Sequence, residues 1–252
     1  MAKAGIGGSG ASLDAAEVAR FSALAESWWD AEGPLCPLHR MNPLRLDYIK
    51  GEIVSHFALD AKSKAPLQSL QLLDVGCGGG LLAEPMARLG AAVTGLDASE
   101  ENIAIARLHA QGASLPIAYV CGTAEDLATE KEKFDVILNM EVIEHVADVK
   151  SYLTACRRLL KDDGLMIFST LARTPKAWLL AIVGAEMVLR WLPKGTHDFT
   201  KFLKPSELAE KLNEAGFRVK DLTGFVFDPL SGRWSIKDDL SVNYADSAVP
   251  AR

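Results

Sequence analysis

A glycine cluster directly after a short apolar run is the feature that most narrows the fold of this chain. Leu70 to Val75 predicts a buried strand, glycines occupy positions 76, 78, 79 and 80, and Leu81 to Leu89 predicts a helix. Glycine permits a tight turn from strand to helix and lets a ligand approach the backbone closely. A P-loop is excluded because no Gly-Lys-Ser/Thr follows, and a nicotinamide fingerprint needs glycine where Leu81 stands. The cluster therefore predicts a ligand-binding turn of another kind.

Strands and helices alternate after this turn. Strands are predicted over 92–96, 117–120, 134–138 and 165–169, and helices over 99–109 and 148–160. Strands separated by helical stretches indicate βαβ units, and right-handed crossovers leave a doubly wound, mostly parallel sheet. A helix over 205–215, a strand over 217–226 and a turn at Ser231-Gly232 before a last strand predict that the sheet ends with antiparallel strands.

We expect a single α/β domain with additions. Residues 1–14 are rich in Gly, Ala and Ser and predict a flexible tail. The remainder, 15–252, divides into N-terminal helices (15–65), a core (66–173), an apolar insert (174–204) and the C-terminal part of the sheet (205–252). Apolar residues at helical spacing predict N-terminal helices over 13–30 and 44–59, with Pro34, Pro37 and Pro43 in the loop between them.

Composition excludes several classes of protein. Hydrophobic residues make up 49% and charged residues 24% of the chain, which is typical of a globular domain. The formal net charge of −6 argues against nucleic acid as a partner, because phosphate binding needs a basic surface. The four cysteines form no C-x-x-C pair, so we expect neither a zinc ribbon nor a thioredoxin-type site. Without a signal peptide or an apolar run of membrane-spanning length, the expected compartment is the cytoplasm.

Acidic residues follow the second and third predicted strands. Asp97 comes 21 residues after Gly76, where a carboxylate accepts hydrogen bonds from ribose hydroxyls. Asp126 lies in the stretch 122–127 after the third strand, and a solvated loop acid is its alternative reading. Together with the D-x-G-x-G-x-G spacing from Asp74 to Gly80, these positions resemble class I methyltransferases, which bind S-adenosylmethionine (SAM). The resemblance implies that Gly76, Gly78 and Asp97 contact SAM and that the stretch with Asp126 borders its adenine.

Two carboxylates and an imidazole, Glu141, Glu144 and His145, follow the fourth predicted strand. If this stretch is helical, the three side chains share one face. Oxygen-rich ligation with one imidazole suits Mg²⁺ or Mn²⁺ better than zinc. The alternative is that they hold no metal, with Glu141 favoured by a helix N-terminus and His145 acting as an orienting or acid/base group. Both readings make these residues catalytic candidates.

The chain from about Phe21 to Tyr244 resembles the ubiquinone-biosynthesis O-methyltransferases, which methylate polyprenyl catechols. The segments outside the core that carry this resemblance are 28–30, 37–45, 184–198 and 242–244. The resemblance implies SAM contacts by Arg45, Gly76, Asp97 and Met140, with Arg45 paired to the methionine carboxylate. It also implies metal ligation by Glu141, Glu144 and His145. A divalent ion lowers the pKa of a chelated catechol hydroxyl and orients it; His197 with Asp198 is a second candidate base.

The apolar run Ala177 to Leu192 predicts an interfacial helix that touches lipid, with Trp178 and Trp191 near its ends. A lid over the substrate pocket or a dimer contact is the alternative. We therefore expect a polyprenyl catechol substrate, peripheral association with the inner membrane, and a biosynthetic complex or a homodimer as further partners. Methylation of a soluble phenol, or a non-catalytic SAM-binding subunit, are the competing functions.

Overall fold

A computed structural model describes residues 12–180, 198–228 and 231–251 of the chain. The strands are β1 (Gln71–Val75), β2 (Ala92–Asp97), β3 (Ala118–Cys121), β4 (Phe134–Met140), β5 (Leu160–Leu171), β6 (Phe217–Asp228), β7 (Arg233–Lys237) and β8 (Asn243–Pro250). In the described residues they form one eight-stranded sheet in the order β3-β2-β1-β4-β5-β8-β6-β7. The first five strands are parallel, and β8, β6 and β7 are antiparallel additions, as the sequence predicts.

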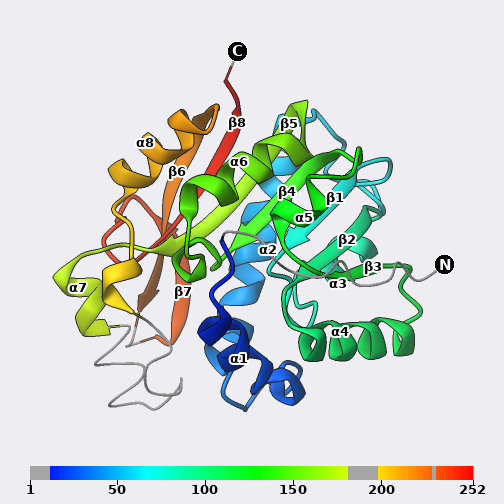
Figure 1. Ribbon diagram of the computed structural model, residues 1–252, viewed down its shortest axis with the longest axis horizontal. Helices are drawn as coiled ribbons and strands as arrows, with labels where there is room; N and C mark the ends of the chain where they lie inside the picture. The colour runs from blue at the N-terminus through cyan, green and yellow to red at the C-terminus, as the bar shows by residue number, and fades with distance from the viewer. Residues whose placement is uncertain (1–11, 181–197, 229–230, 252) are drawn as a thin grey trace.

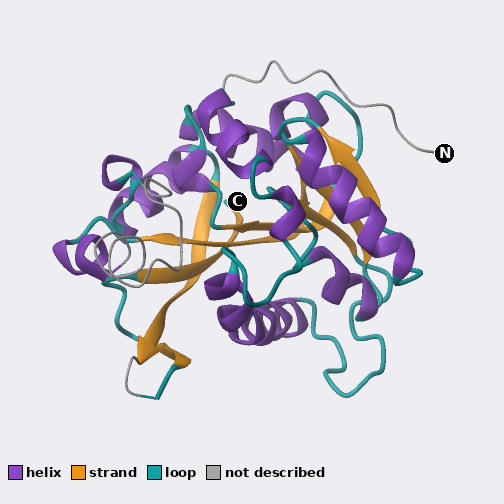
Figure 2. Ribbon diagram, turned by 90° about the horizontal axis from the view of Figure 1, so that it is seen from below, coloured by secondary structure: helices purple, strands orange, loops and turns teal. Residues whose placement is uncertain are grey.

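Helices cover both faces of this sheet (Figures 1 and 2). The α-helices are α1 (Ala15–Ser22), α2 (Cys36–His56), α3 (Ala83–Arg88), α4 (Glu100–Gly112), α5 (Ala124–Leu127), α6 (Val149–Leu159), α7 (Pro175–Ala177) and α8 (Pro205–Glu214). Short 3-10 turns are η1 (Ala25–Ser27), η2 (Ile143–His145) and η4 (Phe199–Lys201). No described helix combines the length and the apolar character that a membrane span requires.

The core lies on both sides of the central strands, because alternate side chains of a strand point to opposite faces. Leu72 and Leu138 belong to the cluster that packs with α2 and α3, whereas Leu73 and Ile137 belong to the cluster that packs with α6 and α8. All four side chains are fully buried. Strands buried on both faces are the expected consequence of parallel βαβ units.

The first of two differences from the sequence prediction concerns the N-terminal helices. The predicted loop around Pro37 and Pro43 is wrong, because α2 begins at Cys36 and continues through Pro43. Pro37 sits in the first turn, where a helix needs no N–H donor. Pro43 removes an internal hydrogen bond, but Met41 and Arg45 on either side of it are buried, and this packing keeps the helix continuous. The helix predicted over 13–30 is shorter, since α1 ends at Ser22 and only η1 follows.

The second difference is at the end of the sheet. The turn at 231–232 leads into β7 at the edge, but β7 is not the last strand. The chain returns as β8 and inserts between β5 and β6, pairing Thr170 with Tyr244 and Thr223 with Ala245. The segment reads Asn-Tyr-Ala-Asp-Ser-Ala-Val-Pro, which lacks the β-branched and aromatic pattern of a strand. Its pairing partners, rather than its own residues, make it a strand.

The last residues of the predicted tail pack onto the domain. The Ser12 carbonyl oxygen accepts a hydrogen bond from the Ala147 amide at 2.8 Å, and the Ser12 amide donates to Glu125 at 3.2 Å. The Asp14 carboxylate then caps α1 by accepting from the amides of Ala16 and Glu17. Residues 1–11, and residues 181–197 of the predicted insert, lie outside the described residues.

Candidate functional site

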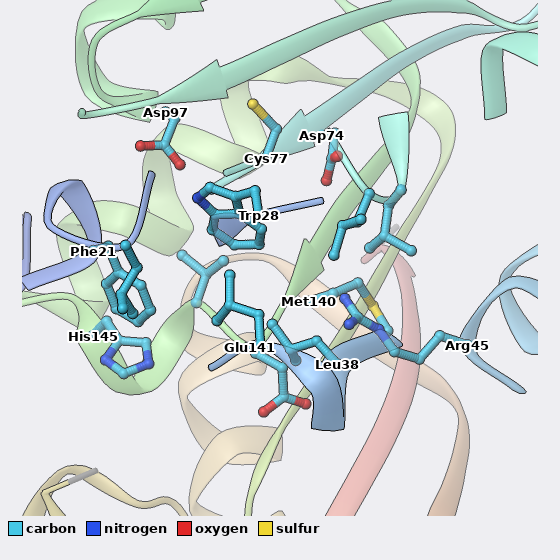
Figure 3. A pocket seen from close by; sticks show the side chains of 16 residues that line it. Phe21, Trp28, Leu38, Arg45, Asp74, Cys77, Asp97, Met140, Glu141 and His145 are labelled. Carbon is cyan, nitrogen blue, oxygen red and sulfur yellow. The ribbon is translucent and has the colours of Figure 1, made fainter. Parts of the chain in front are cut away.

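A cavity of about 180 Å³ lies at the carboxyl ends of β1, β2 and β4 (Figure 3). The chain order along the sheet reverses between β1 and β4, which is where open α/β sheets bind ligands. A second cavity of about 130 Å³ shares Gly76, Asp97, Val142 and His145 with the first. The two cavities therefore form one binding region with two arms.

The glycine turn takes the conformation that its sequence predicts. Gly76 and Gly78 have φ angles of +67° and +52°, which side chains other than hydrogen rarely adopt. A Cβ atom at Gly76 would lie 2.6 Å from a methyl carbon of Val142, and one at Gly78 would lie 2.3 Å from the Trp28 ring. Both glycines are therefore needed for backbone shape and for close packing at the cavity.

Asp97 is held at the end of β2 by three hydrogen bonds. Its carboxylate accepts from the amide of Gly78 at 2.9 Å, from the amide of Ser99 at 2.9 Å and from the side-chain amide of Asn102 at 3.2 Å. Burial raises the pKa of Asp97, while the Ser99 and Gly78 amides oppose that rise. Asp97 lines both cavities, so one carboxylate joins the glycine turn to the binding region.

Arg45 and Asp74 bring opposite charges to the same cavity. Arg45 on α2 is 4% exposed and Asp74 on β1 is 2% exposed. Among the described residues, neither Arg45 Nε nor Asp74 Oδ2 has a hydrogen-bond partner. Burial raises the pKa of Asp74 to about 7, which the Arg45 charge opposes and the Asp97 charge reinforces. A buried cation and a buried carboxyl with unused hydrogen-bonding atoms fit the zwitterionic amino-acid end of a ligand such as SAM.

Met140 ends β4 and Glu141 follows it, and both line the same cavity as Arg45 and Asp74 (Figure 3). Met140 is buried and lines the cavity, where the sequence analysis expects it. Glu141 has a φ of +59°, an uncommon conformation for a residue with a side chain. Its amide donates to the Ser169 carbonyl at 3.0 Å, and its carboxylate accepts from Ser169 Oγ at 2.8 Å. Both bonds tie Glu141 to β5.

Glu144 is buried against the same strand. Its carboxyl accepts a hydrogen bond from Thr170 Oγ1 at 2.8 Å, and only 3% of the residue is exposed. Burial raises the pKa of Glu144 well above its usual range, and the nearby Glu141 charge raises it further.

His145 faces away from these two carboxyls. Its Nδ1 lies 3.2 Å from an oxygen of Glu17 on α1, and its ring meets the Phe21 ring edge-on at a centroid distance of 5.0 Å. The predicted single helical face is wrong, because the left-handed Glu141 breaks the chain direction and only 143–145 form a 3-10 turn. The described residues contain no group of three His, Cys, Asp or Glu side chains placed to hold a metal ion. The arrangement of Glu141, Glu144 and His145 therefore does not fit the expected Mg²⁺ site.

Two other candidates lie apart from the cavities. Asp126 accepts hydrogen bonds from the amide and hydroxyl of Thr123, which caps α5, and it lines neither cavity. Thr123, rather than Asp126, borders the second cavity. Asp198 caps η4 through Thr200, while His197 lies outside the described residues.

Sequence reasoning missed Trp28 and Glu17 as site residues. Trp28 packs on Gly78 and Gly79, and its indole N–H donates to Asn102 at 2.9 Å. The Trp28-Trp29-Asp30 segment is one of the blocks that carry the family resemblance, so a signal for Trp28 was present. Glu17 stands in an amphipathic stretch with no motif around it, and only the folded chain brings it to His145.

Known proteins resemble this chain over most of its length. The family model described as a methyltransferase domain matches residues 73–168. A ubiquinone biosynthesis O-methyltransferase of Cereibacter sphaeroides is 57% identical over 241 residues, covering 95% of this chain and 98% of that protein. One of Dinoroseobacter shibae is 56% identical, covering 94% of this chain and 96% of that protein.

The fold itself has a solved counterpart. The magnesium protoporphyrin IX methyltransferase of Synechocystis PCC 6803, solved with bound SAM, aligns with a TM-score of 0.61 at 19% identity, covering 95% of this chain and 98% of that one. At this identity the likeness shows a shared fold alone. The near-full-length relatives show that this chain belongs to the family of the ubiquinone biosynthesis O-methyltransferases.

Proposed function

We propose that this protein transfers a methyl group from SAM to a catechol hydroxyl of a polyprenylated ubiquinone precursor, and that one site serves both O-methylation steps. The observation that carries the proposal is the 57% identity with an O-methyltransferase of ubiquinone biosynthesis over 95% of the chain. The first cavity adds chemical support, since charged and apolar side chains line it together.

The charged side chains of the first cavity suit the methyl donor. Arg45 is the partner for the carboxylate of SAM, and Asp74 is the partner for its ammonium group. Asp97 is in place for the ribose hydroxyls, and Thr123 borders the second cavity, where the adenine belongs. When bound, SAM supplies a methyl group on a positively charged sulfur, which an aligned nucleophilic oxygen displaces.

The acceptor ring belongs in the apolar part of the cavity, lined by Phe21, Leu24, Leu38 and Val142. A phenol has a pKa of about 10 and is therefore mostly protonated at neutral pH, so the reaction needs a base. We assign this role to His145, which lines both arms of the cavity. The imidazole takes the hydroxyl proton as the oxygen forms its bond to the methyl carbon.

Glu141 and Glu144 hold the site in shape rather than accept the proton of the substrate hydroxyl. Both are hydrogen-bonded to β5, through Ser169 and Thr170. They hold the end of β4 where Met140 and His145 reach the cavity. In the described residues Glu141, Glu144 and His145 do not converge as a three-ligand group for Mg²⁺, and we derive no step through a metal.

Contact with a bilayer is the second part of the proposal. Trp178, Leu179 and Leu180 are 45%, 54% and 48% exposed at the start of the predicted interfacial segment. Apolar side chains this exposed suit insertion into a lipid surface, and the substrate resides there. The rest of the segment, 181–192, lies outside the described residues. We propose peripheral association with the inner membrane, with a pocket lid or a dimer contact as the alternatives.

The test is release of S-adenosylhomocysteine by the purified protein with prenyl catechols of increasing tail length. Turnover with a KM that falls as the tail lengthens supports the lipid substrate, whereas a KM independent of the tail favours a soluble phenol. Tight SAM binding without turnover would move the assignment to a non-catalytic SAM-binding subunit. Parallel reactions with Mg²⁺ and with EDTA test the metal directly, and activity lost in EDTA would overturn our reading of His145.

Membrane contact has its own measurement. Trp178→Glu combined with Leu180→Glu should reduce cosedimentation with liposomes that contain anionic lipid. The matched control is Leu108→Glu, which changes an exposed leucine on α4, far along the chain from the apolar segment. Equal cosedimentation of the parent protein, the double variant and the Leu108→Glu control would count against the membrane proposal.

A further inference from the structure

We infer that Glu17 on α1 is a positioning residue that orients His145 for removal of the acceptor proton. The inference rests on the proposed methyl transfer and deepens it, because it says how the base of that site is assembled. Glu17 comes from a helix outside the sheet, 128 residues before His145 in the chain.

The contact between the two residues is enclosed. Glu17 Oε2 lies 3.2 Å from His145 Nδ1, and the side chains are only 8% and 15% exposed. Phe21 lies one turn after Glu17 on the same face of α1, and its ring packs edge-on against the imidazole. α1 therefore restrains the ring by a hydrogen bond on one side and by an aromatic contact on another.

This contact selects a tautomer. A carboxylate accepts hydrogen bonds and donates none, so Nδ1 carries the proton and donates it to Glu17. Nε2 is then left with a free electron pair. This atom can therefore take a proton from a substrate hydroxyl. Without Glu17, both tautomers become available and the ring is free to rotate.

Glu17 is also held as an ion. Its other oxygen, Oε1, lies 3.2 Å from Lys201 Nζ, and Oε2 lies 3.0 Å from Arg20. The positive charges of Lys201 and Arg20 at these distances favour the ionised form of Glu17. A carboxylate fixed in this way orients the imidazole and leaves the proton on it.

Three separate parts of the chain meet at the pair of Glu17 and His145, which we call the dyad. His145 follows β4, Glu17 lies on α1, and Lys201 ends η4 and also binds Asp14 at 2.8 Å. α1 lines the second cavity as well, through Glu17 and Val18, and so does its N-cap residue Asp14. The base is therefore complete only when α1 is docked over the site.

The experiment compares Glu17→Gln with Glu101→Gln. Glu101 accepts a hydrogen bond from Ser22 at the end of α1, so the control also loosens this helix but touches neither His145 nor the cavities. We expect Glu17→Gln to lower kcat for a prenyl catechol by about 10- to 100-fold, as loss of an orienting partner typically does, with the KM for SAM changed by less than about threefold. Glu101→Gln should keep the kcat of the parent protein.

A spectroscopic readout separates orientation from docking. Nitrogen NMR of the imidazole should report a protonated Nδ1 in the parent protein and a mixture of tautomers in Glu17→Gln. If Glu17→Gln fails to fold, Glu17→Asp provides the same comparison with a shorter reach, and we expect an intermediate kcat. An unchanged kcat with a raised KM for SAM would overturn the inference, because α1 would then close the cavity over SAM without orienting His145.

The outcomes also distinguish this inference from the proposed function. Suppose that the parent protein methylates no catechol but that Glu17→Gln removes the Nδ1–H signal. The contact between Glu17 and His145 would then be confirmed, and the proposed methyl transfer would be overturned. Suppose instead that the parent protein methylates catechol and that Glu17→Gln alters neither kcat nor the tautomer. The orienting role of Glu17 would then be overturned, and the proposed methyl transfer would stand.

Discussion

The affinity for SAM should depend on pH through Asp74. Burial raises the pKa of this carboxyl to about 7 in the protein without ligand, so below that pH it is neutral. An ammonium group placed against it favours the ionised form and returns its pKa toward the ordinary value of 3.8. SAM therefore binds more weakly as pH falls below about 7, and binding in that range releases a proton.

The size of the effect follows from the two pKa values. Between pH 4 and pH 7 the affinity changes about tenfold per pH unit, because one unit is about 1.36 kcal/mol. From about pH 7.5 to about pH 5.5 the dissociation constant should rise roughly 25-fold, or about 1.9 kcal/mol. Arg45 stays charged throughout, and Asp97, whose pKa burial also raises, shifts the affinity in the same direction.

Isothermal titration calorimetry in two buffers of different ionisation enthalpy measures both quantities at once. At about pH 5.5 the parent protein should release nearly one proton for each SAM bound, at about pH 7 roughly half a proton, and above about pH 8 almost none. Asp74→Asn is the matched variant, since it keeps the shape of the side chain and removes the titration. A dissociation constant that is flat with pH, with no proton released, would refute the pairing of Asp74 with the ammonium group.

Two further predictions concern single buried charges. Arg45→Met should weaken SAM binding by about 10- to 100-fold in calorimetry, since a charge-assisted hydrogen bond contributes about 1.5–3 kcal/mol, and an unchanged affinity would remove Arg45 from the site. Asp246 on β8 is 1% exposed, and burial, reinforced by Asp221 and Glu52, raises its pKa to about 8. The unfolded chain ionises at lower pH than the folded protein, so the parent protein should lose stability as pH rises from about 4 to 8, by up to about 6 kcal/mol. Asp246→Asn should lack this part of the slope in urea unfolding; curves that stay parallel would contradict the argument.

The parallel half of the fold could be predicted because its signals are local. The apolar run before the glycine turn, the alternation of strands and helices, and Ser99 as a helix cap are each contained in a few neighbouring residues. Gly76 and Asp97 meet at the cavity for the same reason, since parallel strands place their carboxyl ends at one edge, and the Gly78 amide donates to Asp97 from behind this lining. β8 could not be found in this way, because its stability comes from β5 and β6 on either side.

The acidic cluster shows where sequence spacing stops being informative. Glu141, Glu144 and His145 have the spacing of one helix face, but spacing predicts a face only if the backbone is helical. The positive φ of Glu141 directs its carboxylate to Ser169, Glu144 turns to Thr170, and His145 turns to α1. These choices depend on β5 and on a helix more than a hundred residues away.

Residue types and their order along the chain thus specify a SAM-binding α/β core and the family to which the protein belongs. Only the tertiary structure reveals that Arg45 and Asp74 face one cavity, where Arg45 Nε and Asp74 Oδ2 have no hydrogen-bond partner among the described residues, and that Glu17 holds His145. The physical reason is that a turn or a cap depends on adjacent residues, whereas burial and charge pairing depend on which distant segments pack together.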